Sequence, residues 1–198
     1  MPIRLAVPNE IVTGERRIAL DPVVAKKMIE MGVDVRMQKG AAASALFSDD
    51  QFEGVTLIDS AEELYKDADV IFKVQPPTLD ELNMMQDGCV VASFMAPHLN
   101  QELTQRMCEK KVTSLAMELV PRITRAQSMD ALSSQASISG YKGVLMGADR
   151  AAVFFPMLTT AAGTIRPAKV LIIGAGVAGL QAIATAKRLG AVVSAYDV

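Results

Sequence analysis

The segment from Lys169 to Asp197, KVLIIGAGVAGLQAIATAKRLGAVVSAYD, constrains the fold more than any other stretch of the chain. In it, a short apolar run is followed at once by the glycine-rich turn Gly174-Ala175-Gly176-Val177-Ala178-Gly179. A helical pattern, a second apolar run and an acid come next. This order of strand, glycine turn, helix, strand and acid is the dinucleotide-binding fingerprint in the context that it requires. The segment therefore predicts a βαβ unit that holds a dinucleotide on the backbone of its turn.

Each glycine of the turn has a mechanical task in this interpretation. Gly174 permits the tight turn, Gly176 lets a pyrophosphate approach the backbone, and Gly179 lets the helix pack closely. Backbone N–H groups at Val177 and Ala178 and the positive end of the helix then face the phosphates. The alternative is that the glycines serve only a tight connection between strand and helix.

Asp197 predicts which dinucleotide is bound. At the end of the second strand, its carboxylate would accept a hydrogen bond from the adenosine ribose hydroxyls. Its negative charge would repel a 2′-phosphate. The pattern therefore favours NAD(H) over NADP(H).

The first 120 residues alternate between apolar runs and helical patterns. Strands are expected at 3–7, 33–37, 70–74, 89–94 and 112–117, and helices at 22–31, 49–53, 79–85 and 100–108. Asp21 before Pro22 reads as a helix N-cap, and Ser60 with Glu63 has the spacing of a capping box. Such alternation predicts an α/β fold with parallel, doubly wound sheets.

We therefore expect two Rossmann-like doubly wound parallel-sheet domains, the second truncated after its first βαβ unit. The N-terminal domain is assigned to residues 1–132, a long linking helix and a loop to 133–165, and the start of the NAD(H)-binding domain to 166–198. Two strands and one helix cannot bury both faces of a parallel sheet. The chain is accordingly expected to be the front portion of a longer protein and to be inactive alone.

A polar, basic loop, PRITRAQSMD at residues 121–130, follows the last strand of the first domain. Its polar side chains, and those just after it, are Arg122, Arg125, Gln127, Asp130, Ser133 and Ser134. Loops beyond the carboxyl ends of strands are where ligands sit in open α/β sheets. These groups could clamp a carboxamide or phosphates and hold a nicotinamide ring, or they could form an exposed loop with an N-cap at Asp130 or Ser133.

Other candidate groups favour plainer interpretations. The pair Arg16-Arg17 could bind an anion but is more typical of a solvated face, and His98, the only histidine, lacks an identifiable partner. One histidine without a cysteine cluster predicts no metal site. Cys89 and Cys108 are too few for a disulfide framework, which favours reduced, buried thiols and a cytoplasmic compartment.

Charge and hydropathy exclude two further classes. A net charge of −2 gives no electrostatic reason to bind nucleic acid. No apolar run is long enough to span a bilayer, and the N-terminus lacks a signal-peptide core. With 51% hydrophobic residues, we expect a soluble, core-forming protein.

Three stretches of the sequence together resemble a known protein family. PRITRAQSMDALSSQ, then Gly140-Tyr141, then TTAAGTIRPAKVLIIGAGVAGLQAIATAKRLGA resemble the NAD(H)-binding domain I of proton-translocating nicotinamide nucleotide transhydrogenases. The N-terminal half is also similar to the related alanine dehydrogenases, and the resemblance extends over essentially all 198 residues. It implies an oxidoreductase subunit that binds NADH and passes hydride to NADP⁺ on a partner domain, coupled to proton movement through a membrane-spanning domain. It also implies a homodimer, peripheral on the cytoplasmic face of the inner membrane.

The resemblance assigns residues as well. Those that it points to as catalytic around the nicotinamide are Arg122, Gln127, Asp130 and Ser133. Those that match the cofactor turn and the ribose acid are Gly174, Gly176, Gly179 and Asp197.

Alanine dehydrogenase is the alternative within this resemblance. That family holds and activates its amino acid with a lysine after the third strand and a histidine after the fourth, where this chain has Gln75 and Ala96. Arg17 is retained, but one arginine cannot supply acid–base chemistry. Hydride transfer between two nicotinamides needs alignment and water exclusion rather than such a base. A non-catalytic NAD-binding or scaffold fragment is a third hypothesis.

Overall fold

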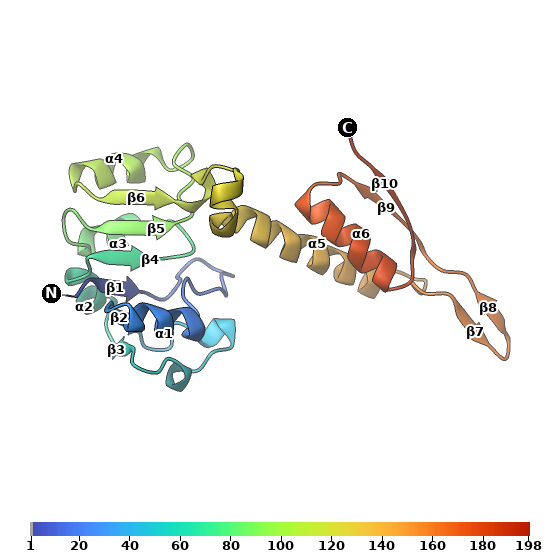
Figure 1. The fold of residues 1–198 in the computed structure, drawn as a ribbon, viewed down its shortest axis with the longest axis horizontal. Coiled ribbons are helices and arrows are strands. Elements are labelled where there is room, and N and C mark those ends of the chain that lie inside the picture. The colour runs from blue at the N-terminus through green and yellow to red at the C-terminus, as the bar shows by residue number, and fades with distance from the viewer. Residues whose placement is uncertain (1) are drawn as a thin grey trace. The chain divides into compact units, whose positions relative to one another are not determined.

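The computed structural model describes residues 2–198, and the chain divides into two compact units between Val120 and Pro121. The first unit contains a parallel sheet with the strand order β3-β2-β1-β4-β5-β6 (Figure 1). Its strands are β1 (Arg4–Val7), β2 (Asp34–Gln38), β3 (Thr56–Ile58), β4 (Val70–Phe72), β5 (Val90–Ser93) and β6 (Thr113–Ala116). This order confirms the expected doubly wound α/β fold, and its topological switch point lies between β1 and β4.

Four α-helices connect these strands: α1 (Pro22–Glu30), α2 (Ala61–Lys66), α3 (Leu79–Met84) and α4 (Gln101–Glu109). Short 3₁₀ turns occur at η1 (Ala43–Ala45), η2 (Asp49–Gln51) and η3 (Met117–Leu119). Two of the helix starts are those that the sequence predicts. The Asp21 carboxylate accepts the Val24 N–H at 2.7 Å, and the Ser60 hydroxyl accepts the Glu63 N–H at 3.4 Å.

The core of the first unit lies on both faces of the sheet, because successive side chains of a strand point to opposite faces. On β1, Leu5 and Val7 pack in the cluster that contains Ala25 of α1. Ala6, between them, packs in a second cluster with Leu64 and other residues of α2, α3 and α4. The sheet is therefore covered on both sides, as a parallel sheet requires.

The second unit is built around two helices and a pair of parallel strands. Its elements are η4 (Thr124–Met129), α5 (Ala131–Arg150), β7 (Leu158–Thr160), β8 (Gly163–Ile165), β9 (Lys169–Ile173), α6 (Val177–Arg188) and β10 (Val192–Tyr196). Strands β9 and β10 pair in parallel, as the βαβ pattern predicts. Helices α5 and α6 pack against each other, with Val144, Phe155, Ala168 and Ala186 buried in one cluster.

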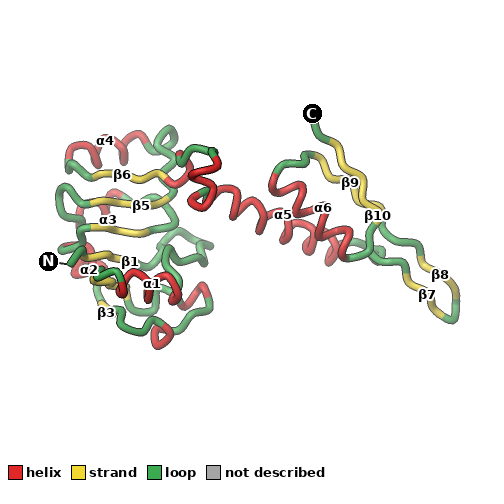
Figure 2. Tube along the Cα trace, in the orientation of Figure 1, coloured by secondary structure: helices red, strands yellow, loops and turns green. Residues whose placement is uncertain are grey.

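Several local expectations were wrong. The loop expected at the end of the segment 133–165 is not a plain loop, because β7 and β8 pair there as an antiparallel hairpin (Figure 2). The long helix begins at Ala131, before the expected residue 133, and it ends at Arg150, because Ala151 is extended. Strand β3 was not expected, and Cys108 is exposed, so only Cys89 is a buried thiol.

The division at Val120 also differs from the domain bounds drawn from the sequence. It groups residues 121–132 with α5 and the nucleotide-type βαβ unit, whereas the sequence pattern groups them with the first sheet. Asp130 gives a local reason, since its side chain caps α5 and so ties the polar loop to that helix. The division into three segments at 132 and 165 remains a proposal.

Candidate functional site

The turn between β9 and α6 has a geometry that depends on two glycines. Gly174 has a φ of +94°, in the left-handed region that favours glycine. A Cβ atom on Gly179 would lie 1.8 Å from the carbonyl oxygen of Gly174, far inside van der Waals contact. Gly176 is the N-cap of α6 and has nothing within 4 Å of the place where a Cβ would be. The turn is thus closed upon itself at Gly179 and open at Gly176.

Asp197 lies beside this turn because β10 runs parallel to β9, with Tyr196 opposite Ile173. Its Oδ2 accepts the backbone N–H of Ala175 at 2.5 Å, and its Oδ1 accepts that of Val198 at 2.7 Å. The carboxylate is exposed and is held against the glycine turn by the turn's own backbone.

The polar loop presents Asp130 to the start of α5. Asp130 Oδ1 accepts the Ser133 N–H at 2.9 Å, and Oδ2 accepts the Ser133 hydroxyl at 2.6 Å. These two hydrogen bonds, the hydroxyl's first, lower the pKa of Asp130 below its usual range, and the positive charge of Arg122 adds to the effect. Asp130 is therefore the N-cap of the helix and also the group that fixes the hydroxyl of Ser133.

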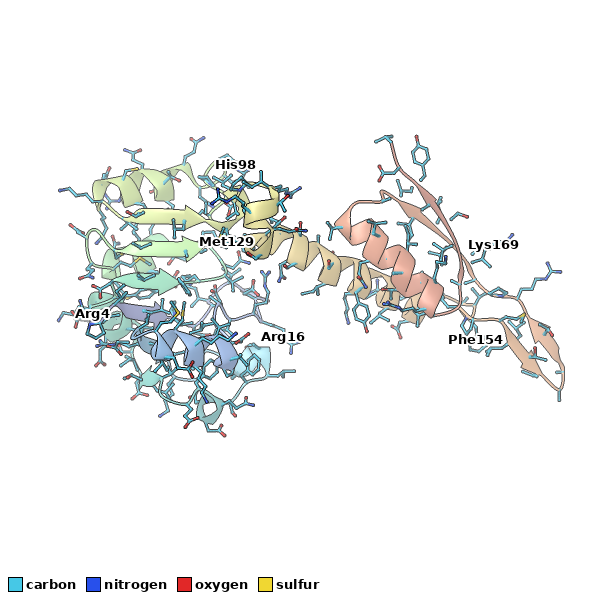
Figure 3. The ribbon with its side chains drawn as sticks, viewed as in Figure 1. Arg4, Arg16, His98, Met129, Phe154 and Lys169 are labelled. Atoms are coloured by element: carbon cyan, nitrogen blue, oxygen red, sulfur yellow. The ribbon has the colours of Figure 1, made fainter. Side chains whose placement is uncertain are left out.

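A pocket of about 360 Å³ brings the polar loop and the glycine turn together. It is lined by Arg122, Leu132, Ser133, Ala136, Ile173, Gly174, Gly176, Val177, Ala178 and Gly179. Asp130 is not among the lining residues, but it is hydrogen-bonded to one of them, Ser133. Its neighbour Met129, the last residue of η4, is labelled in Figure 3. Gln127 and Arg125 are exposed on η4 and do not line the pocket.

The sequence reasoning missed three of the lining residues. Leu132 and Ala136 belong to the same helix as Ser133, one residue before it and three after it. Helical spacing would have placed Ala136 beside Ser133 once the start of α5 was known. Ile173, the last residue of β9, gave no signal because its side chain is apolar, like its neighbours in the strand.

At the switch point of the first unit, Gln75 contacts groups of this chain rather than open space. Its Nε2 donates to Glu15 Oε2 at 2.7 Å, and Arg17 donates to both oxygens of the same carboxylate, at 2.8 Å and 2.6 Å. Hydrogen bonds from Arg17, and also from Gln75, lower the pKa of Glu15 to about 2. The charge of Arg17 is thus balanced by an internal carboxylate whose side chain is only 6% exposed.

That lowered pKa predicts how stability depends on pH. A carboxyl whose pKa is lower in the folded state than in the unfolded state stabilises the fold above its unfolded pKa, and the stabilisation is lost on acidification. For Glu15 the loss falls between its ordinary value of 4.5 and its folded value of about 2.

We expect Glu15→Gln to flatten the acid side of the profile of unfolding free energy against pH, by up to about 1.4 kcal/mol per pH unit in that window. Urea unfolding followed by circular dichroism from pH 2 to 7 measures this. Asp69→Asn is the comparison, because Arg4 also lowers the pKa of Asp69 to about 2, but that pair is partly exposed. Parallel profiles for wild type and Glu15→Gln would contradict the assignment.

A second internal network lies just before Gln75, and the sequence reasoning missed it. Lys73 Nζ lies 2.7 Å from Glu81 Oε1 and 3.6 Å from Glu10 Oε2, and all three side chains are at most 6% exposed. The hydroxyl of Tyr65 also donates to Glu81 Oε1 at 2.7 Å. Glu10 Oε1 accepts the Val74 N–H at 2.5 Å. The carboxylate of Glu10 therefore accepts a backbone hydrogen bond just after the end of β4, so that this N–H group is not available to a ligand.

The remaining candidates take no part in these networks. Ala96, where the related dehydrogenases have a histidine, has no titratable group, and its N–H donates to Glu118 at 2.5 Å. His98 is exposed in the loop between β5 and α4. Among residues 2–198, no group of three or more His, Cys, Asp or Glu side chains could hold a metal ion. In the same range of the chain, no helix is both long and apolar enough to cross a membrane.

Two family models together match most of the chain, and they meet within α5 rather than at the structural division after Val120. The alanine dehydrogenase/PNT N-terminal domain model matches residues 6–139, and the alanine dehydrogenase/PNT C-terminal domain model matches residues 143–198. A protein from Haemophilus influenzae named NAD(P) transhydrogenase subunit alpha is 44% identical over 98% of this chain and 38% of its own length. An alanine dehydrogenase from Methanococcus maripaludis is 27% identical over 98% of this chain and 53% of its own length.

Solved structures give the same ranking. A transhydrogenase structure from Sinorhizobium meliloti is 45% identical, with a TM-score of 0.95 over 98% of this chain and 59% of that one. An L-alanine dehydrogenase structure is 26% identical, with a TM-score of 0.88 over 99% of this chain and 55% of that one. The chain spans about half the length, or less, of the curated relatives that it matches. With family models matching both of its units, the chain belongs to the alanine dehydrogenase/PNT family.

Proposed function

We propose that this chain is the NAD(H)-binding portion of a proton-translocating transhydrogenase, in which hydride passes between NAD(H) and NADP(H). The observation that carries the proposal is the pocket that Ser133 and Arg122 share with the glycine turn. It is supported by 44% identity to a transhydrogenase alpha subunit against 27% to an alanine dehydrogenase.

The residues around the turn fit a dinucleotide. Gly176 leaves open space at the N-terminus of α6, where the backbone N–H groups of Val177, Ala178 and Gly179 would receive the pyrophosphate. Asp197, held at the turn by Ala175, would accept from the adenosine ribose hydroxyls. When bound, the nicotinamide supplies the carbon that accepts or releases hydride. The chain supplies binding and orientation.

At the other end of the pocket, the hydroxyl of Ser133 donates its hydrogen to Asp130, so its lone pairs remain available to a ligand. Ser133 would then accept from the nicotinamide carboxamide, whose NH₂ group is a donor, and so set the position of the ring. Asp130 would hold that hydroxyl in orientation. Arg122 would hold the cofactor. Gln127 is exposed outside the pocket lining, so it would orient the carboxamide or a bound water only where the cofactor extends beyond this pocket.

We further propose the partners that such a subunit requires. Hydride transfer needs NADP(H) on a partner domain, and coupling to proton translocation needs a membrane-spanning domain. The chain would be a homodimer, peripheral on the cytoplasmic face of the inner membrane through those partners. By itself, without these partners, it would be inactive.

The alternative is an alanine dehydrogenase-like NAD-dependent oxidoreductase. It is disfavoured because Gln75 is bound to Glu15, the charge of Arg17 is balanced by the same carboxylate, and Ala96 cannot transfer a proton. A non-catalytic NAD-binding fragment would bind the cofactor without any transfer. One assay separates the three: reduction of an NAD⁺ analogue by NADPH in the presence of the NADP(H)-binding partner, compared with alanine-dependent reduction of NAD⁺ by this protein alone.

Nucleotide choice tests the role of Asp197 directly. In a protein extended to the length of its curated relatives, NADH should bind on the order of 100-fold more tightly than NADPH, because a like charge opposite the 2′-phosphate costs several kcal/mol. Asp197→Ala should narrow that difference to a few-fold. Isothermal titration calorimetry with both nucleotides measures the two affinities.

Asp197→Asn is the control that separates the charge of Asp197 from its hydrogen bond to the glycine turn. It removes the charge but keeps an oxygen that can accept the Ala175 N–H. It should therefore narrow the difference as Asp197→Ala does, with less loss of NADH affinity. Equal binding of NADH and NADPH by the wild type would refute the assignment of Asp197.

A further inference from the structure

Three residues on one face of α5 point to a contact that the fingerprint does not contain. Ser133, Ala136 and Gly140 follow one another at the i, i+3 and i+7 spacing of a helical face. Ser133 and Ala136 line the pocket opposite the glycine turn. Gly140 is buried one turn further along, where the same face of α5 meets α6.

At Gly140 the two helices touch through backbone alone. A Cβ atom there would lie 2.1 Å from the carbonyl oxygen of Ala178, 2.9 Å from its carbonyl carbon and 3.1 Å from its Cα. Real Cβ atoms essentially never approach a heavy atom within 3.0 Å, and a backbone oxygen cannot rotate away as a side chain can. Any residue larger than glycine must therefore separate α5 from the start of α6.

The other glycines of α5 are not held in this way. Gly143 and Gly147, three and seven residues further on, have nothing within 4 Å of the places where their Cβ atoms would be. Glycine in a helix interior is disfavoured relative to alanine. Of the three glycines in α5, only Gly140 is therefore required by a close approach to Ala178.

Ala178 is the second residue of α6 and one of the residues that line the pocket. A displacement of Ala178 therefore also moves Val177 and Gly176, relative to Ser133 on the facing helix. We propose that Gly140 is a positioning residue for hydride transfer, which sets the separation between the Ser133 hydroxyl and the glycine turn across the pocket. This inference rests on the proposed function, because it assigns the two sides of the pocket to one dinucleotide.

The size of the effect follows from the geometry. To bring the contact of 2.1 Å to an acceptable distance, the helices must separate by about 1 Å. A misplacement of about 1 Å can slow a reaction on the order of 100-fold when the reacting groups must be aligned. Binding should suffer less, since the glycine turn and Asp197 would still hold the pyrophosphate and the ribose.

The experiment compares Gly140→Ala with Gly143→Ala and Gly147→Ala, which are matched in helix, chemistry and gain of helix propensity. Each is made in the protein extended to the length of its curated relatives. NADH affinity is measured by calorimetry, and hydride transfer by reduction of an NAD⁺ analogue by NADPH with the NADP(H)-binding partner. We expect transfer in Gly140→Ala to fall on the order of 100-fold, with NADH affinity changed by less than about five-fold. The two controls should stay within about two-fold of the wild type in both measurements and melt at or above its Tm.

A double-mutant cycle with Ser133→Ala separates positioning from a general loss of stability. If Gly140 acts by placing Ser133 against the turn, then Gly140→Ala has little further effect on transfer once the Ser133 hydroxyl is gone. Additive losses would overturn the proposal, as would a Gly140→Ala variant that transfers hydride like Gly143→Ala.

A crystal structure of the wild-type protein with NADH provides a test that does not require any variant to fold. The Gly140–Ala178 contact should persist in it, and a complex in which α5 has moved away from Ala178 would overturn the proposal. The wild type also keeps this inference distinct from the proposed function. If the wild type binds no NADH, the proposed function is wrong. If it binds NADH but the three glycine variants transfer hydride at the same rate, only the role of Gly140 is wrong.

Discussion

Replacing Asp130 by asparagine is expected to slow hydride transfer by about 100-fold or more, with NADH affinity changed only a few-fold. Asp130 accepts both the N–H and the hydroxyl of Ser133, at 2.9 Å and 2.6 Å. Asparagine has one acceptor oxygen and an NH₂ group, which can only donate. If the amide oxygen keeps the Ser133 N–H, the NH₂ group donates to the Ser133 hydroxyl, which then turns its own hydrogen away from residue 130 and has one lone pair fewer for the nicotinamide. Misalignment of this kind lowers kcat before it lowers binding.

Asp149→Asn is the matched control, because Asp149 is an exposed acid near the other end of α5. It should leave both rate and affinity within about two-fold of the wild type. The hydrogen bonds from Ser133 hold the pKa of Asp130 below its ordinary value of 3.8. Asp130 therefore stays ionised near neutral pH, and its titration should not make the rate of hydride transfer depend on pH in that range. An Asp130→Asn variant with unchanged transfer would contradict the role of this residue.

Replacing Lys73 by methionine is expected to destabilise the first unit by about 3–5 kcal/mol, since removing one partner leaves buried charge uncompensated. The side chain of Lys73 is 1% exposed, and its ammonium group lies near Glu81 and Glu10, whose side chains are 6% and 4% exposed. Without the ammonium group, the carboxylates of Glu10 and Glu81 keep their other hydrogen bonds but lose the buried cation that lies beside both of them. Equilibrium unfolding in urea, followed by circular dichroism, measures the change.

Lys39→Met provides the comparison at the surface. Lys39 lies 3.5 Å from Asp59, with the two side chains 64% and 86% exposed. Exposed pairs of this kind contribute about 0–1 kcal/mol. Equal losses of stability in Lys39→Met and Lys73→Met would show that the buried network carries no special weight. A triple variant that also changes Glu10 and Glu81 to glutamine should recover some of the loss, because it removes the charge together with its partner.

The elements with strong local signals could be predicted from the sequence. Asp21 before Pro22, the apolar run of β9 and the glycine turn each specify a structure through a few neighbouring residues. The βαβ unit could also be predicted, because the turn, the helix and both strands agree with one another. Within the polar loop, the sequence left the N-cap open between Asp130 and Ser133, and the structure places it at Asp130.

Features that depend on contacts between distant residues could not be predicted. Lys73 reads as a strand residue, and only the fold brings Glu10 beside it, across the switch point. Strand β3 and the strands of the hairpin are three residues long, too short for a clear alternation of apolar and polar residues. The sequence shows a glycine at position 140, but it does not show why a side chain is excluded there, which is the carbonyl oxygen of Ala178 on another helix.

The contact between Gly140 and Ala178 also bears on how these two positions can change in evolution. The atom nearest to a side chain at position 140 would be a backbone oxygen, which every amino acid carries. In an ordinary packed pair, a larger residue on one side can be compensated by a smaller residue on the other. Here no replacement at position 178 makes room. The constraint on residue 140 is therefore expected to leave no trace of correlated substitution at 178, and a survey of covarying pairs would pass over it.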